Sequence, residues 1–322
     1  ARLTEAIQTS RNDYAIWHVA SSLGRIGSGN QSAIAALADK VQVSDNEYTR
    51  WQAAYSLGKI DPGNPIALAT LVQLIQTSKN EYVLWQAASS LGKLDPNNPQ
   101  AIPSLVKLIK TSTNESIRQL SAYSLGQIGS SNPTAIHALV VLILTSNNDS
   151  TRRKACVSLG KIARDNEIAG SALRLLIQTC ENECTRWRAA YSLGRIDPGN
   201  EHAIAALVQL IQTAETKSIR QLATCSLGRI ANGNETAITA LIELIQTSEE
   251  PSIRWLAAGS LWQTSNGNET AITTFIELIH PSQEESTRQL AAYSLEKILQ
   301  DEQFPLVIST VKNYLAERVG EP

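Results

Sequence analysis

The dipeptide Ser-Leu recurs along this chain at one fixed interval. It occurs at positions 22, 56, 90, 124, 158, 192, 226, 260 and 294, always 34 residues apart, which makes nine copies without an insertion. The phrase WQAAYSLGKIDPGN at 51–64 returns as WRAAYSLGRIDPGN at 187–200. A fixed period of about 20–50 residues indicates a solenoid, in which each repeat packs only on its neighbours. The repeat therefore overrides the two domains that a length of 322 residues would otherwise suggest.

Each repeat is predicted to form two antiparallel helices. Asn64 caps the first helix and Pro65 takes its first position, where a missing N–H costs nothing. The second helix is expected from about Glu81 to Leu94, and 95–98 turns the chain back. The sequence contains no strand signal, so we expect an all-α fold. Asn recurs in the capping position at 30, 98, 132, 166, 200, 234 and 268.

The second helix distinguishes this repeat from a tetratricopeptide repeat, which has the same period. Leu57-Gly58 follows Trp51 by six residues, whereas the tetratricopeptide pattern places the pair at three. The phrase TRWQAAYSLGKI at 49–60 instead resembles the second helix of HEAT repeats. Specifically, it resembles the short HEAT-like repeats of phycobilin lyases and of NACHT-type arrays, and it is closer to the latter. The cadence IDPGN…AI..L..L.QTS resembles the arrays at the C-terminal end of cyanobacterial NACHT-type STAND NTPases.

The resemblance implies a right-handed α–α superhelix, a HEAT-like solenoid of about nine repeats over residues 1–300. A capping helix of the same domain is expected within 301–322, from Phe304 to Val319, because terminal repeats need a polar outer face. The first repeat begins in the middle of a helix, and the chain contains no Met. We therefore expect an upstream part of a longer parent protein.

A helical wheel sorts the second-helix positions into two arcs. Ala53, Ala54, Leu57 and Ile60 are predicted on the buried arc, and the Trp51, Tyr55, Gly58 and Lys59 positions on the open arc. The resemblance implies that this open face lines the concave surface of the array. An arginine column falls inside the buried arc, where we expect a structural ladder to carbonyls or acids of a neighbouring repeat. This column consists of Arg50, Arg118, Arg152, Arg186, Arg220, Arg254 and Arg288.

The open arc supplies the candidate binding residues. Five of the six tryptophans share one column, at 17, 51, 85, 187 and 255, and tyrosines and basic residues follow beside it. Trp and Tyr are typical of interaction hot spots. Packing between repeats is the alternative for the tryptophans, and complementing the helix dipole is the alternative for the basic residues. In the eighth repeat Trp262 replaces Gly and Gly259 replaces Tyr, which indicates either local repacking or a shaped pocket. The predicted partner-binding set is Trp51, Tyr55, Lys59, Trp85, Lys93, Tyr123, Trp187, Tyr191, Arg195, Arg229, Trp255 and Trp262.

The sequence offers no set of catalytic residues. The four histidines, at 18, 137, 202 and 280, occupy unrelated columns, and the open arc is almost free of carboxylates. Cys180 and Cys184 could form half a metal site, but no second pair completes it, so we expect reduced thiols and no metal or cofactor. The pI near 6.2 gives no global attraction to nucleic acid or membranes. We expect a cytoplasmic location.

These patterns favour a non-catalytic module that recognises a protein or peptide in the concave groove. The NACHT resemblance implies a sensor or scaffold array of a larger signalling ATPase, and a defence role for some members. Two alternatives remain open. The aromatic and basic columns could bind single-stranded nucleic acid by stacking and charge. The lyase resemblance allows a subunit of a bilin lyase.

Overall fold

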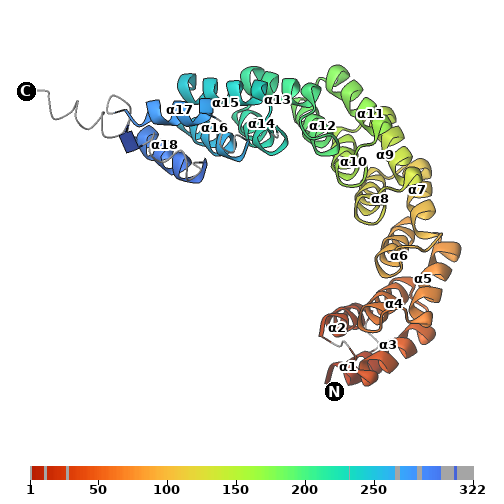
Figure 1. Ribbon diagram of the computed structural model, residues 1–322. Coiled ribbons are helices and arrows are strands. Elements are labelled where there is room, and N and C mark those ends of the chain that lie inside the picture. The colour runs from red at the N-terminus through yellow and green to blue at the C-terminus, as the bar shows by residue number, and fades with distance from the viewer. Residues whose placement is uncertain are drawn as a thin grey trace, which may run out of the picture. The chain divides into compact units, whose positions relative to one another are not determined.

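The computed structural model describes residues 2–10, 13–26, 29–231, 233–264, 269–280, 285–298 and 308–309. Within these ranges the chain forms eighteen α-helices and no strand (Figure 1). The all-α prediction is therefore confirmed. The capping helix predicted from Phe304 to Val319 lies outside the described residues, apart from Ile308 and Ser309.

The helices alternate between the two positions of the repeat. The first helices are α1 (Arg2–Thr9), α3 (Gln31–Val43), α5 (Pro65–Thr77), α7 (Ala101–Thr111), α9 (Pro133–Thr145), α11 (Glu167–Thr179), α13 (Glu201–Thr213), α15 (Glu235–Thr247) and α17 (Glu269–Leu278). The second helices are α2 (Asp13–Ile26), α4 (Glu47–Ile60), α6 (Glu81–Leu94), α8 (Glu115–Ile128), α10 (Asp149–Ile162), α12 (Glu183–Ile196), α14 (Lys217–Ile230), α16 (Pro251–Thr264) and α18 (Glu285–Ile298). The bounds predicted for one full repeat, a first helix from Pro65 and a second helix over Glu81–Leu94, are confirmed.

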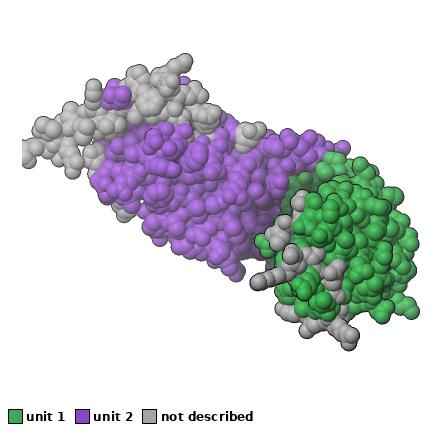
Figure 2. Space-filling view, turned by 90° about the horizontal axis from the view of Figure 1, so that it is seen from below, with its two compact units in different colours: residues 1–163 green, residues 164–322 purple. Residues whose placement is uncertain are grey.

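The chain divides into two compact units, residues 1–163 and 164–322 (Figure 2). Each unit has two layers. First helices pack on first helices, as α3 does on α1 and α5, and second helices pack on second helices, as α14 does on α12 and α16. Every contact of this kind joins neighbouring repeats, so each unit is an α–α solenoid. The organisation of 1–300 as one array stays a prediction.

Asparagine side chains begin most of the described helices. Asn64 Oδ1 accepts from the backbone N–H groups of Ile66 and Ala67, and Asn80 Oδ1 accepts from Tyr82 and Val83 at the start of the second helix. Each cap satisfies donors that have no partner inside the helix, and losing one typically costs about 1 kcal/mol. The predicted cap at the first helix is confirmed for Asn30, Asn64, Asn132, Asn166, Asn200 and Asn234.

The helix after Asn98 departs from this pattern. It begins at Ala101, and no side chain caps it, so the expectation for Asn98 is wrong. Pro103 gives the physical reason. A helix that begins at Ala101 places Pro103 in the first turn, where its missing N–H removes no helical hydrogen bond. A helix begun at residue 99 would have placed this proline one turn deeper, where it breaks the ladder.

The turn between repeats ties each repeat to the next one. The residue before the capping Asn has a positive φ, +82° at Gly63 and +83° at Gly199, and Ser131 and Asp165 adopt the same region. The Gly199 N–H donates to the Ile230 carbonyl at 2.9 Å, and the Ser131 N–H donates to the Ile162 carbonyl at 3.0 Å. These carbonyls end the second helix of the following repeat, where no intrahelical donor remains. The turns at Gly29, Ser131, Asp165 and Gly199 thus close the second helix of the following repeat.

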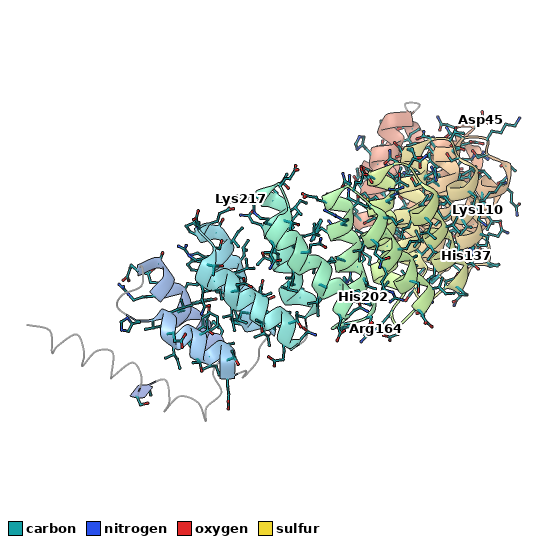
Figure 3. The ribbon with its side chains drawn as sticks, turned by 90° about the horizontal axis from the view of Figure 1, so that it is seen from above. Asp45, Lys110, His137, Arg164, His202 and Lys217 are labelled. Carbon is teal, nitrogen blue, oxygen red and sulfur yellow. The ribbon has the colours of Figure 1, made fainter. Side chains whose placement is uncertain are left out.

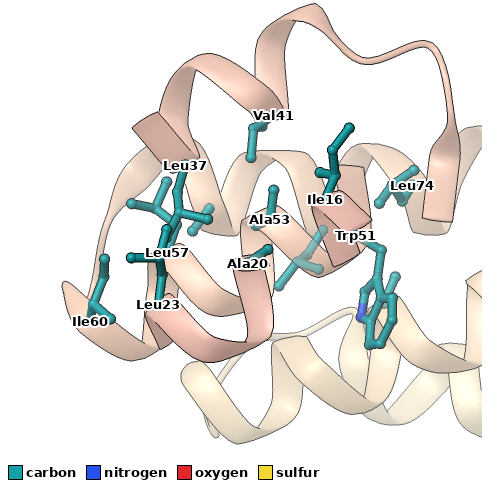
Figure 4. Packing of buried hydrophobic residues seen from close by; sticks show 14 of the residues in the cluster. Ile16, Ala20, Leu23, Leu37, Val41, Trp51, Ala53, Leu57, Ile60 and Leu74 are labelled. Carbon is teal, nitrogen blue, oxygen red and sulfur yellow. The ribbon is translucent and has the colours of Figure 1, made fainter. Parts of the chain in front are cut away.

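Small residues bring successive second helices close together. Ala53, Ala54 and Leu57 are fully buried in the core of the N-terminal unit (Figure 4). A Cβ added to Gly58 would lie 2.4 Å from Leu94 Cδ1, and one added to Gly126 would lie 2.8 Å from Ser158 Cα. The prediction that the Gly58 column lies on an open face is therefore wrong. Glycine is present because the next helix occupies the space of a side chain.

We expect Gly126→Ala to destabilise the fold, although alanine favours helices by about 1 kcal/mol over glycine. The added methyl group would collide with the backbone of α10 and force a shift that costs about 1–3 kcal/mol. Urea denaturation monitored by circular dichroism measures this difference.

Gly170→Ala is the matched control in helix α11. Its Cβ would lie 3.5 Å from Arg174 Nη1, an ordinary contact, so helix propensity alone should act. We expect this variant to be as stable as the wild type or more so. Equal destabilisation of both variants would contradict the close-contact explanation.

Candidate functional site

Each second helix is enclosed on several sides, which leaves only a narrow strip exposed. Helix α4 contacts α2, α3, α5 and α6, and so even Gln52 and Ser56 are buried. The exposed or partly exposed positions of α4 are Tyr48, Tyr55 and Lys59, together with its first turn. We define the second-helix strip as the positions equivalent to 48, 52, 55 and 59 in each repeat, together with Trp255, which is exposed at the position equivalent to 51. Position 52 is buried in α4 but is exposed or partly exposed in most other repeats.

The tryptophan column belongs mainly to the interface between repeats. Trp51 and Trp187 are each only 6% exposed, and their indole Nε1–H groups donate to Ser90 Oγ and Ser226 Oγ in the next repeat, both at 2.9 Å. Trp85 is partly buried and donates to Ser124 Oγ at 2.9 Å. The predicted open position is therefore wrong for Trp51 and Trp187. The Trp17 side chain lies outside the described residues.

The eighth repeat differs from the others at the same position. Trp255 is 48% exposed, and Ser294, the residue equivalent to Ser90, is buried with no hydrogen-bond partner for its Oγ among the described residues. Trp262 is partly exposed. It occupies the position at which the first seven repeats have glycine, as at Gly58 and Gly126. Trp255, unlike Trp51 and Trp187, is therefore a surface residue in this repeat.

The basic column lies on the surface throughout the described part of the chain. The side chains of Tyr55 and Lys59 form an i, i+4 pair in which the ammonium lies 5.9 Å from the ring centroid, and Tyr293 and Lys297 form the same pair at 5.4 Å. Tyr191 is partly exposed beside the exposed Arg195. Such cation–π contacts hold the long side chains over the strip. The exposed members of the column are Arg25, Lys59, Lys93, Lys161, Arg195, Arg229 and Lys297.

An aromatic cluster on α4 and α6 escaped the sequence analysis. The Tyr48 ring lies 5.2 Å from Trp51 and stacks on Tyr82 at 6.1 Å, and the Trp51 ring stacks on Tyr55 at 6.5 Å. Tyr82 is 40% exposed. The available signal was the recurrence of tyrosine at 14, 48 and 82 in successive repeats.

Tyr48 and Tyr55 stay protonated at neutral pH, because the pKa of each is raised. Burial, followed by the neighbouring Tyr82 phenol, raises the pKa of Tyr48 above its usual value. Burial also raises the pKa of Tyr55. Both groups therefore present neutral hydroxyls, so the cluster adds hydrogen-bonding capacity without charge.

The arginine column acts mostly within the protein. The guanidinium of Arg220 donates to the Ala214 carbonyl at 2.7 Å and to Glu250 of the next repeat at 2.7 Å. Arg152 and Arg254 donate to the carbonyls of Ser146 and Ser248 in their own turns. Arg118 and Arg288 pair with Glu115 and Glu285 in their own helices. The Nε atoms of Arg50 and Arg186 are buried and have no hydrogen-bond partner among the described residues.

Glutamates at the start of the second helices also link repeats. Ser78 Oγ donates to Glu47 at 2.7 Å, Ser112 Oγ donates to Glu81 at 2.6 Å, and Thr151 Oγ1 donates to Glu115 at 2.5 Å. An acid in the first turn of a helix also interacts favourably with the helix dipole. The structure adds a charge-assisted hydrogen bond to the next repeat, which makes them part of the scaffold.

The described residues hold no group of three or more His, Cys, Asp or Glu side chains arranged for a metal ion. Cys156 and Cys180 are buried, Cys184 and Cys225 are partly buried, and all four are free thiols. His137 and His202 are exposed on the first helices α9 and α13 (Figure 3). No helix in the described ranges is long and apolar enough to cross a membrane.

The repeat geometry agrees with a comparison to known protein families. The sequence model described as HEAT repeats matches residues 1–92, 68–160, 138–228 and 204–296, which together include nearly the whole chain. The chain belongs to the HEAT-repeat family. No curated protein sequence matches it.

Solved structures of a karyopherin resemble this HEAT-repeat chain. They include Kap121p bound to the SUMO protease Ulp1p, with 12% identity and a TM-score of 0.45 over 99% of this chain. Kap121p bound to RanGTP gives a TM-score of 0.47 and Kap121p bound to Nup53p gives 0.44, each at 12% identity and over 99% of this chain. This chain spans 43% of the karyopherin's length in each case.

We expect Trp187→Ala and Trp255→Ala to differ sharply in stability. Trp187 fills a buried site between repeats, so its removal should cost about 3–5 kcal/mol. Trp255 is half exposed, so its removal should cost less than about 1 kcal/mol of stability. Urea denaturation of the two variants measures the difference. A loss of similar size in both would contradict the separation into packing and surface tryptophans.

The carboxylate of Glu250 should make stability depend on pH. Hydrogen bonds and ion pairs from Lys217 and Arg220 hold its pKa below the usual value. A lowered pKa in the fold stabilises the protein above the carboxyl's ordinary pKa of about 4.3, and this contribution disappears as pH falls through the lower folded value. We expect wild type to exceed Glu250→Gln in urea midpoint at about pH 6, with the gap closing toward about pH 3.

Glu249→Gln is the control for this titration, because Glu249 is exposed and neighbours Glu250 in sequence. Its midpoint should follow that of wild type at both pH values. If the difference in urea midpoint between wild type and Glu250→Gln instead widened on acidification, the ionised carboxylate would not be the stabilising form.

Proposed function

We propose that this chain is a non-catalytic module that recognises a protein or peptide along its second-helix strip. One observation carries the proposal: the strip keeps large aromatic side chains at the surface although the fold does not need them there. Tyr82 is 40% exposed, Tyr123 44%, Trp255 48% and Tyr293 51%. Tyrosine and tryptophan with an apolar body and a polar edge are the residues that interfaces use most effectively.

The contacts separate the residues that hold the scaffold together from those that remain available to a partner. The arginine column, the first-turn glutamates and the buried tryptophans bond within or between repeats, so they are engaged in the scaffold. Lys59, Lys93 and Arg195 are exposed, and no carboxylate pairs with them in the described part of the chain. The strip therefore offers polar and aromatic groups that the scaffold leaves available.

The wider setting is part of the proposal. The repeat cadence resembles arrays at the C-terminal end of NACHT-type NTPases, which supports a role as the sensor or scaffold array of a longer signalling protein, with the ligand in its concave groove. The four free thiols favour a reducing compartment such as the cytoplasm.

Nucleic-acid binding is the second candidate. The stacked rings of Tyr48 and Tyr82 favour it, together with the exposed Lys59 and Lys93 at the other ends of the same helices, because stacking and positive charge together hold single strands. The net charge of −2 argues against it, since phosphate binding relies on an electrostatic excess. No observation in the described residues favours the bilin-lyase hypothesis.

Co-purification from the native lysate tests the proposal. The strip variant combines Tyr55→Ser, Tyr123→Ser and Trp255→Ser. The matched control combines Val43→Ser, Leu144→Ser and Ile168→Ser, which remove exposed apolar side chains from first helices. Both should keep the melting profile of the wild type. We expect one protein partner to survive nuclease treatment, to remain with the control and to be lost with the strip variant.

Two results would overturn the proposal. Recovery of nucleic acid alone would favour the second candidate. Equal retention of the partner by the strip variant and the control would remove the strip from recognition.

A further inference from the structure

Two lysines of α10 converge on one exposed tyrosine of α8. Lys154 Nζ lies 5.9 Å from the centroid of the Tyr123 ring, and Lys161 Nζ lies 5.4 Å from the same centroid. Tyr123 itself is 44% exposed. The structure thus gathers two ammonium groups around one accessible ring, and they come from a repeat other than the tyrosine's own.

No carboxylate of the surrounding helices neutralises this charge. The only acids of α6, α8 and α10 are Glu81, Glu115 and Asp149, and each lies in the first turn of its helix. Glu81 accepts from Ser112, Glu115 pairs with Arg118, and Asp149 pairs with Arg152. Among the described residues, Lys154 and Lys161 have no ion pair. The cluster therefore carries two unmatched positive charges.

The positions beside the lysines carry apolar and amide side chains rather than charged ones. Leu120 and Val157 are partly exposed on the same faces of α8 and α10, three or four residues from Tyr123 and Lys161. Gln127 is exposed one turn beyond Tyr123. An apolar side chain of a ligand can pack against Leu120 and Val157. The side-chain amide of Gln127 can both donate to and accept from a peptide backbone.

We propose that this patch, formed by Leu120, Tyr123, Gln127, Lys154, Val157 and Lys161, binds an acidic peptide segment with an apolar side chain between carboxylates. The inference rests on the proposed function and names the chemistry of its partner. Each lysine pairs with a carboxylate while the apolar side chain packs between Leu120 and Val157. Charge complementarity of this kind fixes register and speeds association.

The same features argue for a peptide over a nucleic acid. The ammonium groups of Lys154 and Lys161 lie near the Tyr123 ring and compete with a base for its faces. Lysine is a compact point charge and suits single carboxylates, while tracking a phosphate backbone requires a longer continuous row. Gln127 interrupts the basic column between Lys93 and Lys161.

Fluorescence anisotropy on the full chain tests the proposal. The probe is a labelled peptide with the core Asp-Glu-Phe-Glu-Asp, and its control has the core Asn-Gln-Phe-Gln-Asn. We expect wild type to bind the acidic peptide and not the amide peptide. Lys154→Gln with Lys161→Gln should weaken binding about tenfold or more. Tyr123→Ala should also weaken it, and binding should fall as salt is raised.

Lys107→Gln with Lys110→Gln is the matched control, because it removes the same charge from exposed positions of the first helix α7 (Figure 3). Its affinity for the acidic peptide should stay within about twofold of wild type. A thermal melt of both double variants shows that the fold is intact, since all four lysines are exposed.

Three outcomes would overturn the inference. They are no binding of the acidic peptide by wild type, an equal loss in both double variants, and tight binding of a labelled oligothymidine that depends on Lys154 and Lys161. The proposed function is judged separately. A native protein partner that depends on the strip but tolerates the Lys154 and Lys161 changes would leave it standing.

Discussion

Close contact between successive second helices is the interaction on which the rest of this structure depends. Glycine and alanine at the contact allow the helices to approach, and a Cβ at Gly194 would lie 2.4 Å from Ile230 Cδ1 of the next repeat. Hydrogen bonds join the same neighbouring repeats, from the Trp187 indole to Ser226 and from Ser112 to the Glu81 carboxylate. Small residues and polar links therefore act together at the junctions between repeats.

This contact also decides what is left for function. A second helix that is enclosed by four neighbours exposes little more than one narrow strip, so recognition has few positions available in each repeat. The repeat compensates by presenting the same positions many times. Small differences between copies then give the surface its character, as at Tyr82 in one repeat, Lys154 in another and Trp255 in a third. The proposed binding surface uses positions that differ between repeats, while the scaffold uses positions that recur in most of them.

Much of the fold could be predicted from the sequence because the relevant signals are local. Asn64 and Pro65 mark a helix start wherever they occur, and the period of 34 fixed the pairing of helices. The site was harder. A helical wheel assumes one buried arc, whereas α4 is enclosed on several sides, so Trp51 and Gly58 were assigned to a surface that does not exist. The convergence of Lys154 on Tyr123 depends on side chains from two repeats, and no single-helix pattern contains it.

The turn that donates its N–H to the following repeat has a consequence for how such proteins change length. The Gly199 N–H closes the helix that ends at Ile230, and the same link joins Gly29 to Ile60, Ser131 to Ile162 and Asp165 to Ile196. An insertion of a few residues between such a donor and its carbonyl would misalign that link, whereas the gain or loss of a whole 34-residue segment returns each donor to an equivalent carbonyl. Gene duplication and deletion in whole repeats are thus structurally silent, and the reach of the binding surface can evolve in fixed steps.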